Sequence, residues 1–217
     1  MAISPKILYP ANKKSIFCTL IFALIFLSTC QVKEECEKFI GEEYLDVQID
    51  SNLLVGAFEY KDRLIKRFGE TPIKDLNYSA YHLQFFSSFG FGQSIKFEKK
   101  DFGYLLSVKC ITKEGYLQDC NEYQAIIDEE DWNKLEEMIY EFNFWTAQQF
   151  KKSSEDVLDG FTYCLEGNRP EAINCNKKTY QFIAWSSPRY DKIGALCDYI
   201  MQYEFSLAQK YKTRRLN

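Results

Sequence analysis

A series of short segments in which apolar residues alternate with other residues fills the middle of this chain. Tyr81, Leu83 and Phe85 illustrate the period of two, which is the pattern of β-strands. Turn-forming residues separate the segments at spacings that favour an antiparallel meander. The pattern predicts strands at about residues 78–86, 94–98, 104–112, 122–127, 160–166 and 179–185.

Two further segments have the period of an amphipathic helix. The first follows Asp128, the predicted N-cap, and has one apolar stripe at Trp132, Leu135, Ile139 and Phe142. The second is predicted to open at Pro188 and to bury Ile193, Leu196, Cys197, Ile200 and Leu207. We therefore expect an α+β fold, with an antiparallel sheet of about five or six strands covered by two or more helices.

Residues 1–29 are predicted to be a signal peptide that the mature protein lacks. Their charges are Lys6, Lys13 and Lys14, and an apolar run follows at residues 16–27. A basic start before about 7–15 apolar residues is typical of a secretory signal. A helix that spans the membrane core needs about 20 residues, so a permanent transmembrane anchor is the alternative that this length disfavours.

The end of this run, Leu27-Ser28-Thr29-Cys30, resembles the lipobox of bacterial lipoproteins, although the family usually has Gly, Ala or Ser at the position of Thr29. The resemblance implies that the mature chain begins at Cys30 and is held to a membrane by lipid on that residue. The alternative is an ordinary signal peptide that is cut nearby. The following residues 31–35 (QVKEE) are similar to a signal that sends some lipoproteins of the Bacteroidetes type to the cell surface, which implies an outer-membrane or surface location.

Residues 30–50 are expected to form a lipidated tether or short helix, and residues 51–217 a single α+β domain without an internal linker. Removing residues 1–29 takes away three lysines and no acids, which leaves 24 Lys+Arg against 31 Asp+Glu, a net charge of −7. Such an acidic chain lacks the basic surface of a nucleic-acid binder. The expected partners are therefore the membrane, through the lipid, and a protein.

Six cysteines remain in the mature chain besides Cys30, and an even number in an exported protein indicates disulfides. Cys110 and Cys120 flank Gly115, so this pair could close a hairpin. Another predicted hairpin pair, on either side of a turn at residues 168–170, is Cys164 with Cys175. This leaves Cys36 and Cys197 to join the two ends of the chain. The alternative is that some of the six are buried thiols.

Few residues of the chain suit catalysis. His82, the one histidine, lies in a strand pattern and is interpreted as an edge or surface residue rather than a catalytic base. Asp159 and Glu166 form the one carboxylate pair considered for glycoside hydrolysis. The alternative interpretation is a turn at Asp159 and a solvent-facing Glu166 at a strand end. Because no metal-binding, Walker A or Gly-x-Gly-x-x-Gly motif occurs, we expect neither a metal nor a cofactor.

The last 90 or so residues of the chain contain several motifs in this order: Phe144-Trp145, Asp159-Gly160, Glu166, and Trp185 before Ser187-Pro188. They resemble a group of uncharacterised bacterial exported lipoproteins that share the pattern FW … DG … E … W-S-P. The resemblance implies a shared fold element and no particular reaction.

We expect a non-catalytic cell-envelope lipoprotein that binds a macromolecular partner. One form would be an immunity-type inhibitor whose acidic surface complements a basic toxin. The alternative is a small carbohydrate-active protein that uses Asp159 and Glu166, or a glycan-binding protein with exposed aromatic residues such as Phe89, Phe91 or Trp185. An enzyme would have a pocket with converging carboxylates, whereas a binding protein would have a flat patch and buried tryptophans.

Replacing Cys30 by alanine is expected to release the protein from the membrane, because the thiol that would receive the lipid is lost. Detergent phase partitioning measures this, with the wild type in the detergent phase and the variant in the aqueous phase. Cys18→Ala, within the predicted signal peptide, is the control and should partition like the wild type. Recovery of wild type and Cys30→Ala alike in the aqueous phase would contradict the lipid anchor.

Overall fold

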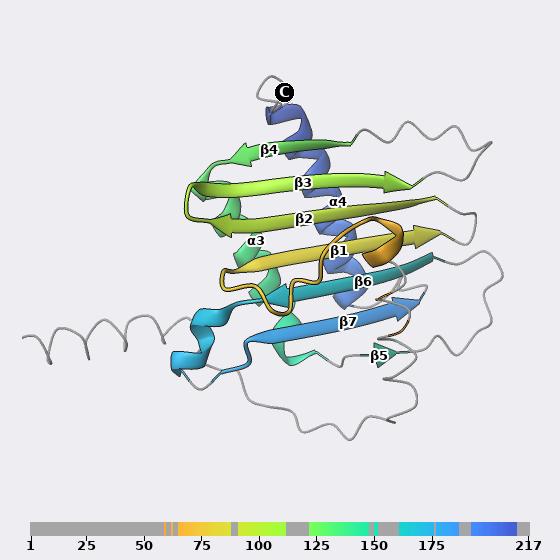
Figure 1. Ribbon diagram of the computed structural model, residues 1–217. Helices are drawn as coiled ribbons and strands as arrows, with labels where there is room; N and C mark the ends of the chain where they lie inside the picture. The colour runs from red at the N-terminus through yellow and green to blue at the C-terminus, as the bar shows by residue number, and fades with distance from the viewer. Residues whose placement is uncertain are drawn as a thin grey trace, which may run out of the picture. The chain divides into compact units, whose positions relative to one another are not determined.

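A computed structural model describes residues 59, 62, 65–87, 91–111, 122–147, 150–151, 161–175, 177–186 and 192–211. All of them belong to one compact unit, Gly41–Asn217 (Figure 1). The predictions for the signal peptide, the lipid and the tether lie outside the described residues. The same holds for the candidate residues Cys30, Cys36, Phe89, Cys120 and Asp159.

The described residues form a seven-stranded sheet with the order β4-β3-β2-β1-β6-β7-β5 (Figure 1). Its strands are β1 (Ala80–Ser87), β2 (Gly92–Lys100), β3 (Gly103–Ile111), β4 (Tyr123–Ile127), β5 (Phe150–Lys151), β6 (Phe161–Asn168) and β7 (Tyr180–Ser186). Neighbouring strands are antiparallel, except that β5 runs parallel to β7. The predicted meander is confirmed in β1 to β4. The two residues of β5 are too few to show a period, and the strand was not predicted.

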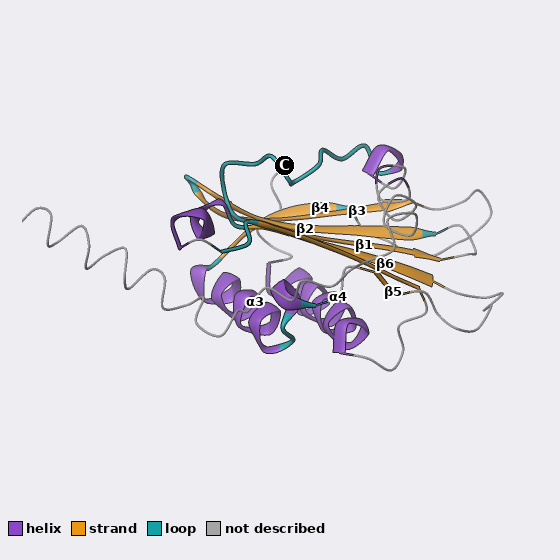
Figure 2. Ribbon diagram, turned by 90° about the horizontal axis from the view of Figure 1, so that it is seen from below, coloured by secondary structure: helices purple, strands orange, loops and turns teal. Residues whose placement is uncertain are grey.

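Two helices, α3 (Glu129–Glu141) and α4 (Lys192–Tyr211), lie on the same face of the sheet (Figure 2). We call this the inner face and the opposite one the outer face. Two short 3-10 helices, η1 (Phe144–Thr146) and η2 (Pro170–Cys175), complete the described elements. The α+β architecture is thus confirmed. None of the described helices is long and apolar enough to cross a membrane.

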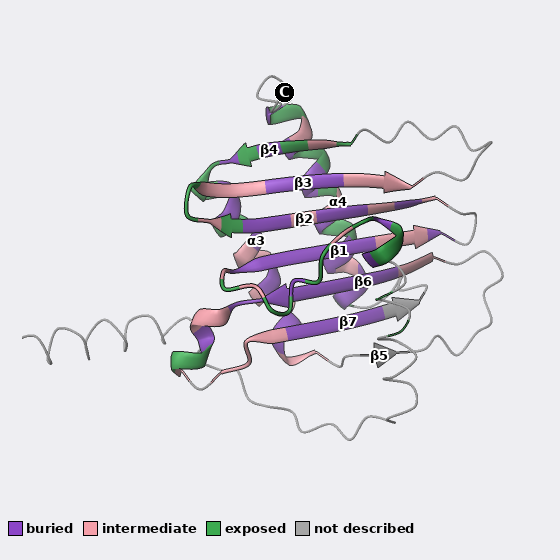
Figure 3. Cartoon of the chain, in the orientation of Figure 1, coloured by how far each residue is buried: buried purple, intermediate pink, exposed green. Residues whose placement is uncertain are grey.

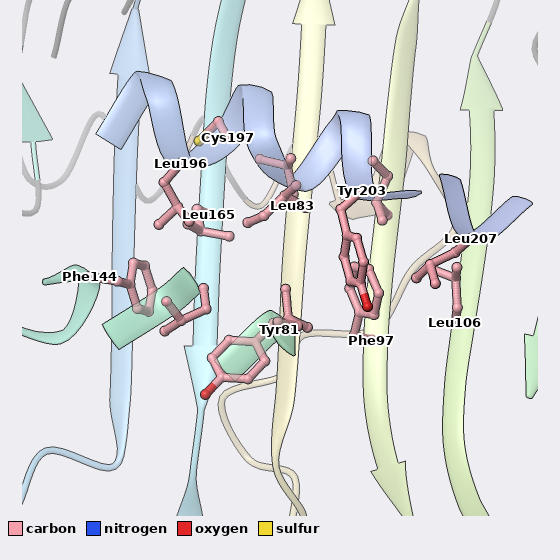
Figure 4. Packing of buried hydrophobic residues seen from close by; sticks show 14 of the residues in the cluster. Tyr81, Leu83, Phe97, Leu106, Phe144, Leu165, Leu196, Cys197, Tyr203 and Leu207 are labelled. Carbon is pink, nitrogen blue, oxygen red and sulfur yellow. The ribbon is translucent and has the colours of Figure 1, made fainter. Parts of the chain in front are cut away.

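The inner face carries the main hydrophobic core. Leu196, Cys197, Tyr203 and Leu207 of α4 point toward inner-face residues such as Leu83 and its neighbours on the adjoining strands (Figure 4). These side chains are buried, as the helical spacing predicts for Leu196, Cys197 and Leu207. Full burial of a leucine contributes roughly 1.5–3 kcal/mol, so this seam holds α4 to the sheet.

The start of α3 is held differently from the prediction. Asp128 lies at the N-cap, but its side chain makes no capping hydrogen bond. Its backbone N–H instead donates to Tyr211 Oη at 3.0 Å, at the end of α4. Asp131, one turn later, accepts hydrogen bonds from Lys210 Nζ at 2.7 Å and from Tyr203 Oη at 3.1 Å. Contacts between the two helices therefore take the place of a local cap.

The outer face of the sheet is also covered. Residues 65–79, which we call the strap, precede β1 and run across this face (Figures 1 and 2). Figure 3 shows the consequence, because β1 and β6 are buried along most of their length while β4 keeps exposed positions. Polar side chains on the outer face of the central strands must therefore find partners within the protein.

The cysteines differ from two of the predicted pairings. Cys110 and Cys175 are each disulfide-bonded. Cys164 and Cys197 are buried thiols. The predicted pairs Cys164–Cys175 and Cys36–Cys197 are therefore wrong.

The failure of the Cys164–Cys175 prediction has a geometric cause. The prediction assumed a tight hairpin, but η2 lies between β6 and β7. Cys164 sits inside the ladder, opposite Ala184, whereas Cys175 ends η2 and lies beyond the ladder. Pairing of Cys110 with Cys120 stays a prediction, because Cys120 is outside the described residues.

Any side chain at Gly167 in β6 is expected to destabilise the protein. A Cβ atom at this position would lie 2.6 Å from Phe144 Cε1 and 3.0 Å from Trp145 Cη2. Because such overpacking costs roughly 1–3 kcal/mol, Gly167→Ala should lower the free energy of unfolding by about that amount in urea denaturation. Glu137→Ala, at an exposed position of α3, should change it by less than about 0.5 kcal/mol. Equal stability of the two variants would show that η1 does not pack on β6 in this way.

Candidate functional site

Two of the three residues considered for catalysis, His82 and Glu166, are not where the sequence interpretation placed them, and the third, Asp159, lies outside the described residues. They lie directly opposite each other on β1 and β6, the central pair of strands. Both are 0% exposed, so the prediction of an edge or surface histidine and of a solvent-facing Glu166 is wrong. The period of two identifies a strand but does not say whether the strand is central or what covers its polar face.

A chain of four polar side chains crosses the outer face from β2 to β7. Ser94 Oγ lies 2.8 Å from His82 Nε2, and His82 Nδ1 lies 3.6 Å from Glu166 Oε1. Tyr180 Oη donates a hydrogen bond to Glu166 Oε2 at 2.8 Å. We call Ser94, His82, Glu166 and Tyr180 the His82 network. It connects four adjacent strands, since each residue comes from a different one.

The ionisation of Tyr180 follows from this position. Burial raises the pKa of Tyr180, and the negative charge of Glu166 raises it further, well above the usual value. The phenol therefore stays protonated and can serve as a donor to the buried carboxylate. A buried carboxylate needs such donors, because leaving a charge without hydrogen bonds in the interior is costly.

The His82 network has the order of a nucleophile, a base and a carboxylate. Two observations argue against that chemistry in this structure. Ser94 is 1% exposed, so the hydroxyl group is not open to a substrate. The 3.6 Å separation between His82 and Glu166 also exceeds a hydrogen-bonding distance. The arrangement is that of a buried polar network which connects strands.

The buried amide of Gln84 stands out beside the network. Gln84 lies opposite Ser94 on β2 and Cys164 on β6, and its side chain is fully buried. Among the described residues, neither its amide nitrogen nor its amide oxygen has a hydrogen-bond partner, and the same is true of His82 Nδ1. Each buried polar group without a hydrogen bond destabilises the fold by about 1–3 kcal/mol. The packing of the surrounding residues must therefore compensate for this loss.

An ion-pair cluster fixes the strap over this region. Glu70 Oε2 lies 2.8 Å from Lys96 Nζ, and Glu70 Oε1 lies 3.0 Å from Lys109 Nζ. We call these three residues the Glu70 bridge. Burial raises the pKa of Glu70, but the hydrogen bonds and charges of the two lysines outweigh this effect, so the pKa lies below its usual value.

Further contacts hold the rest of the strap. The side chain of Ile73 in the strap is fully buried. The side-chain amide of Asn168 donates hydrogen bonds to the carbonyl oxygens of Leu76 and Tyr78, both at 2.9 Å. Ser79 Oγ donates to Glu171 Oε2 in η2 at 2.9 Å. Polar contacts from Asn168 and Glu171 therefore help to fasten the strap.

Arg169, next to the end of β6, is a buried charged residue that the sequence interpretation read only as part of a turn. Its Nε donates to the Lys178 carbonyl at 2.8 Å and its Nη1 to Tyr140 Oη at 3.1 Å. The guanidinium carbon lies 3.7 Å from the centroid of the Trp145 ring, a cation–π contact. Arg169 joins β6, α3 and η1, and no local sequence pattern distinguishes it from a solvated turn arginine.

The aromatic residues give little support to a glycan platform among the described side chains. Trp132 and Trp145 are buried in the main core. Phe91 is partly buried and lies 5.5 Å from Phe85, measured between ring centroids. Phe89 and the side chain of Trp185 lie outside the described part of the structure.

Large apolar side chains are nevertheless exposed elsewhere. They are Phe102, Ile126, Ile173, Tyr199 and Phe205. Phe102 and Ile126 lie at the same end of the sheet. Gly103, the residue after Phe102, is next to Ile126, since a Cβ atom built on Gly103 would lie 3.8 Å from Ile126 Cγ2. Phe102, in the turn between β2 and β3, is 68% exposed and Ile126, on β4, is 40% exposed. We call these two residues with the half-buried Leu105, which pairs with Ile126, the β4 patch.

No protein-family model matches the chain, and neither a curated protein nor a solved structure is similar to it at a significant level. Within the described ranges, no group of three or more His, Cys, Asp or Glu residues could hold a metal ion. The chemistry of the described residues is therefore the basis for a functional proposal.

Glu70→Gln is expected to destabilise the protein at neutral pH, because it removes the charge that the two lysines share. The expected loss in free energy of unfolding is about 1.5–3 kcal/mol near pH 7. Since the pKa of Glu70 is lowered by folding, its contribution is present above its ordinary value of 4.5 and is lost as the pH falls through the folded-state pKa. Urea denaturation near pH 7 and near pH 3 should show the difference between wild type and variant shrink at the lower pH.

Glu137→Gln, at an exposed position of α3, is the matched control and should leave both curves unchanged. A difference between wild type and Glu70→Gln that is the same at both pH values would contradict the ion-pair origin of the effect.

Proposed function

We propose that this chain is an exported, lipid-anchored, non-catalytic protein of the cell envelope that binds a macromolecular partner. One observation carries the binding role. The reactive groups of the His82 network, on Ser94, His82 and Glu166, are buried, whereas the apolar side chains of the β4 patch are exposed and have acidic neighbours. Exposed apolar side chains with a polar rim are typical of an interaction site.

The state of the cysteines supports export. Cys110 and Cys175 are disulfide-bonded, and disulfides persist mainly in oxidising compartments outside the cytoplasm. This agrees with a signal peptide at residues 1–29 and a lipid on Cys30, which both remain parts of the proposal. Location at the outer membrane or the cell surface belongs to the same proposal.

The acidic composition favours a basic partner. The chain has 31 Asp+Glu against 27 Lys+Arg, and the excess of acids grows when residues 1–29 are removed. Complementary charge speeds association and suppresses wrong partners. An immunity-type inhibitor that blocks a basic toxin enzyme is one specific form of this proposal.

A hydrolase is the second candidate function, and the 2.8 Å contact between Ser94 Oγ and His82 Nε2 favours it. Such an enzyme would have to expose Ser94 by displacing the strap. The glycan-directed alternative that uses Glu166 would need the same opening, because Glu166 is also enclosed. The binding proposal needs no such rearrangement.

The lipid-free mature chain is expected to retain a protein from envelope extract saturably and to hydrolyse no ester, peptide or glycoside substrate in a Ser94-dependent way. Affinity capture and substrate assays on wild type, Ser94→Ala and Glu166→Gln measure both properties. Hydrolysis that both substitutions abolish, with melting temperatures unchanged and no partner retained, would overturn the binding proposal in favour of the enzyme.

A further inference from the structure

We propose that β4 accepts an extended, basic segment of a protein partner as an additional strand of the sheet. The inference rests on the proposed binding function and names the surface and the chemistry of the partner. In this mode the backbone of the partner pairs with an open sheet edge, while alternate side chains of the partner meet the faces of the sheet.

The sheet has an edge that is open among the described strands. β4 is the last strand at one end of the sheet, and no described strand pairs with its outer side (Figure 1). At the opposite end the sheet finishes in β5, which has two residues. Proteins usually protect an edge with lysine, proline or a bulge. The sequence of β4, YQAII, contains neither lysine nor proline, and its five residues pair with β3 without a bulge.

An apolar surface lies beside that edge. Ile126 points to the outer face, because its neighbours Ala125 and Ile127 belong to the core on the inner face. It is 40% exposed there. Leu105 is its cross-strand neighbour on β3, and Phe102 lies in the adjoining turn. Side chains directly opposite on paired strands lie about 4.5–5.5 Å apart, so an added strand would place its own side chain against Ile126.

Acidic residues lie at both ends of β4. Glu122 precedes the strand, and Asp128, Glu129 and Glu130 follow it, all exposed. Asp101 is exposed in the turn beside Phe102. Of these, Asp128 has a cationic neighbour, Lys210, at 3.6 Å. The ends of the edge are therefore acidic, which favours a segment with lysine or arginine at its ends.

The same charges disfavour a second copy of this chain as the occupant. Antiparallel pairing of two β4 strands would bring Glu122 of one copy close to the acidic residues 128–130 of the other. Like charges placed opposite each other destabilise strand pairing. A basic partner would instead be attracted to the acidic residues at both ends of the strand.

Both ends of β4 are fixed by hydrogen bonds to α4. From the inner side, Tyr123 Oη donates to Glu204 Oε1 at 2.6 Å, which ties the start of β4 to α4. The hydrogen bond from the Asp128 backbone to Tyr211 Oη ties its end to the same helix. A strand held at both ends is preorganised, so less conformational entropy is lost when a partner binds.

The test uses the lipid-free mature chain and a fluorescent seven-residue peptide of alternating valine and lysine or arginine. Fluorescence anisotropy is expected to show saturable binding that weakens with added salt, because the attraction is partly electrostatic. Hydrogen exchange followed by NMR should show slower exchange of β4 amides when the peptide is bound. A peptide of the same charge with two central prolines cannot pair as a strand and should not bind.

Ile126→Lys is expected to weaken peptide binding by about tenfold or more, since it replaces an apolar contact with a like charge. The matched control is Ile173→Lys, which makes the same change at an isoleucine that is 70% exposed in η2, and it should bind like the wild type. Equal melting temperatures of the wild type and the two variants would show that a change in affinity does not result from unfolding.

Equal affinity of Ile126→Lys and Ile173→Lys, exchange protection away from β4, or a wild-type dimer that Ile126→Lys dissociates would each overturn the inference. These outcomes differ from the failure of the proposed function. Ser94-dependent hydrolysis would remove the binding role as a whole, whereas partner capture that survives Ile126→Lys would remove only the assignment to β4.

Discussion

The ion pairs between Glu70 and the two lysines, Lys96 and Lys109, are the interaction on which the arrangement of the outer face depends. They hold the strap across the sheet, and the strap converts a face that would otherwise meet water into an interior. Because α3 and α4 cover the other face, the central strands are buried on both sides (Figures 2 and 3). This enclosure sets the environment of every polar group on β1 and β6.

Enclosure explains the unusual polarity of this interior. A buried carboxylate such as Glu166 is tolerable because Tyr180, whose pKa is raised by burial and by that carboxylate, remains a donor. Arg169 is tolerable because a carbonyl, a phenol and an indole surround its guanidinium. Networks of this kind specify one arrangement of strands, since slipping the register would leave charges without partners.

The same enclosure buries the reactive groups of the protein and leaves apolar side chains exposed at a different place. Ser94 and His82 have suitable atoms for a reaction but no exposure, while Phe102 and Ile126 have exposure and no reactive atoms. The strap covers the middle of the outer face and stops short of β4, which leaves an apolar and acidic edge. That contrast makes recognition of another macromolecule the better explanation of the surface.

The sequence by itself determined the α+β class, most strands and the two covering helices, because periods of two and 3.6 are local properties of a chain. It also indicated disulfides, but not which cysteines form them, since pairing depends on distances that a hairpin assumption misjudged at Cys164. Only the tertiary structure decided that β1 and β6 are central, that the strap buries His82 with Glu166, and that β4 is left open. The physical reason is that burial is set by what lies across a face, and the strap reaches that face through contacts between residues far apart in the sequence.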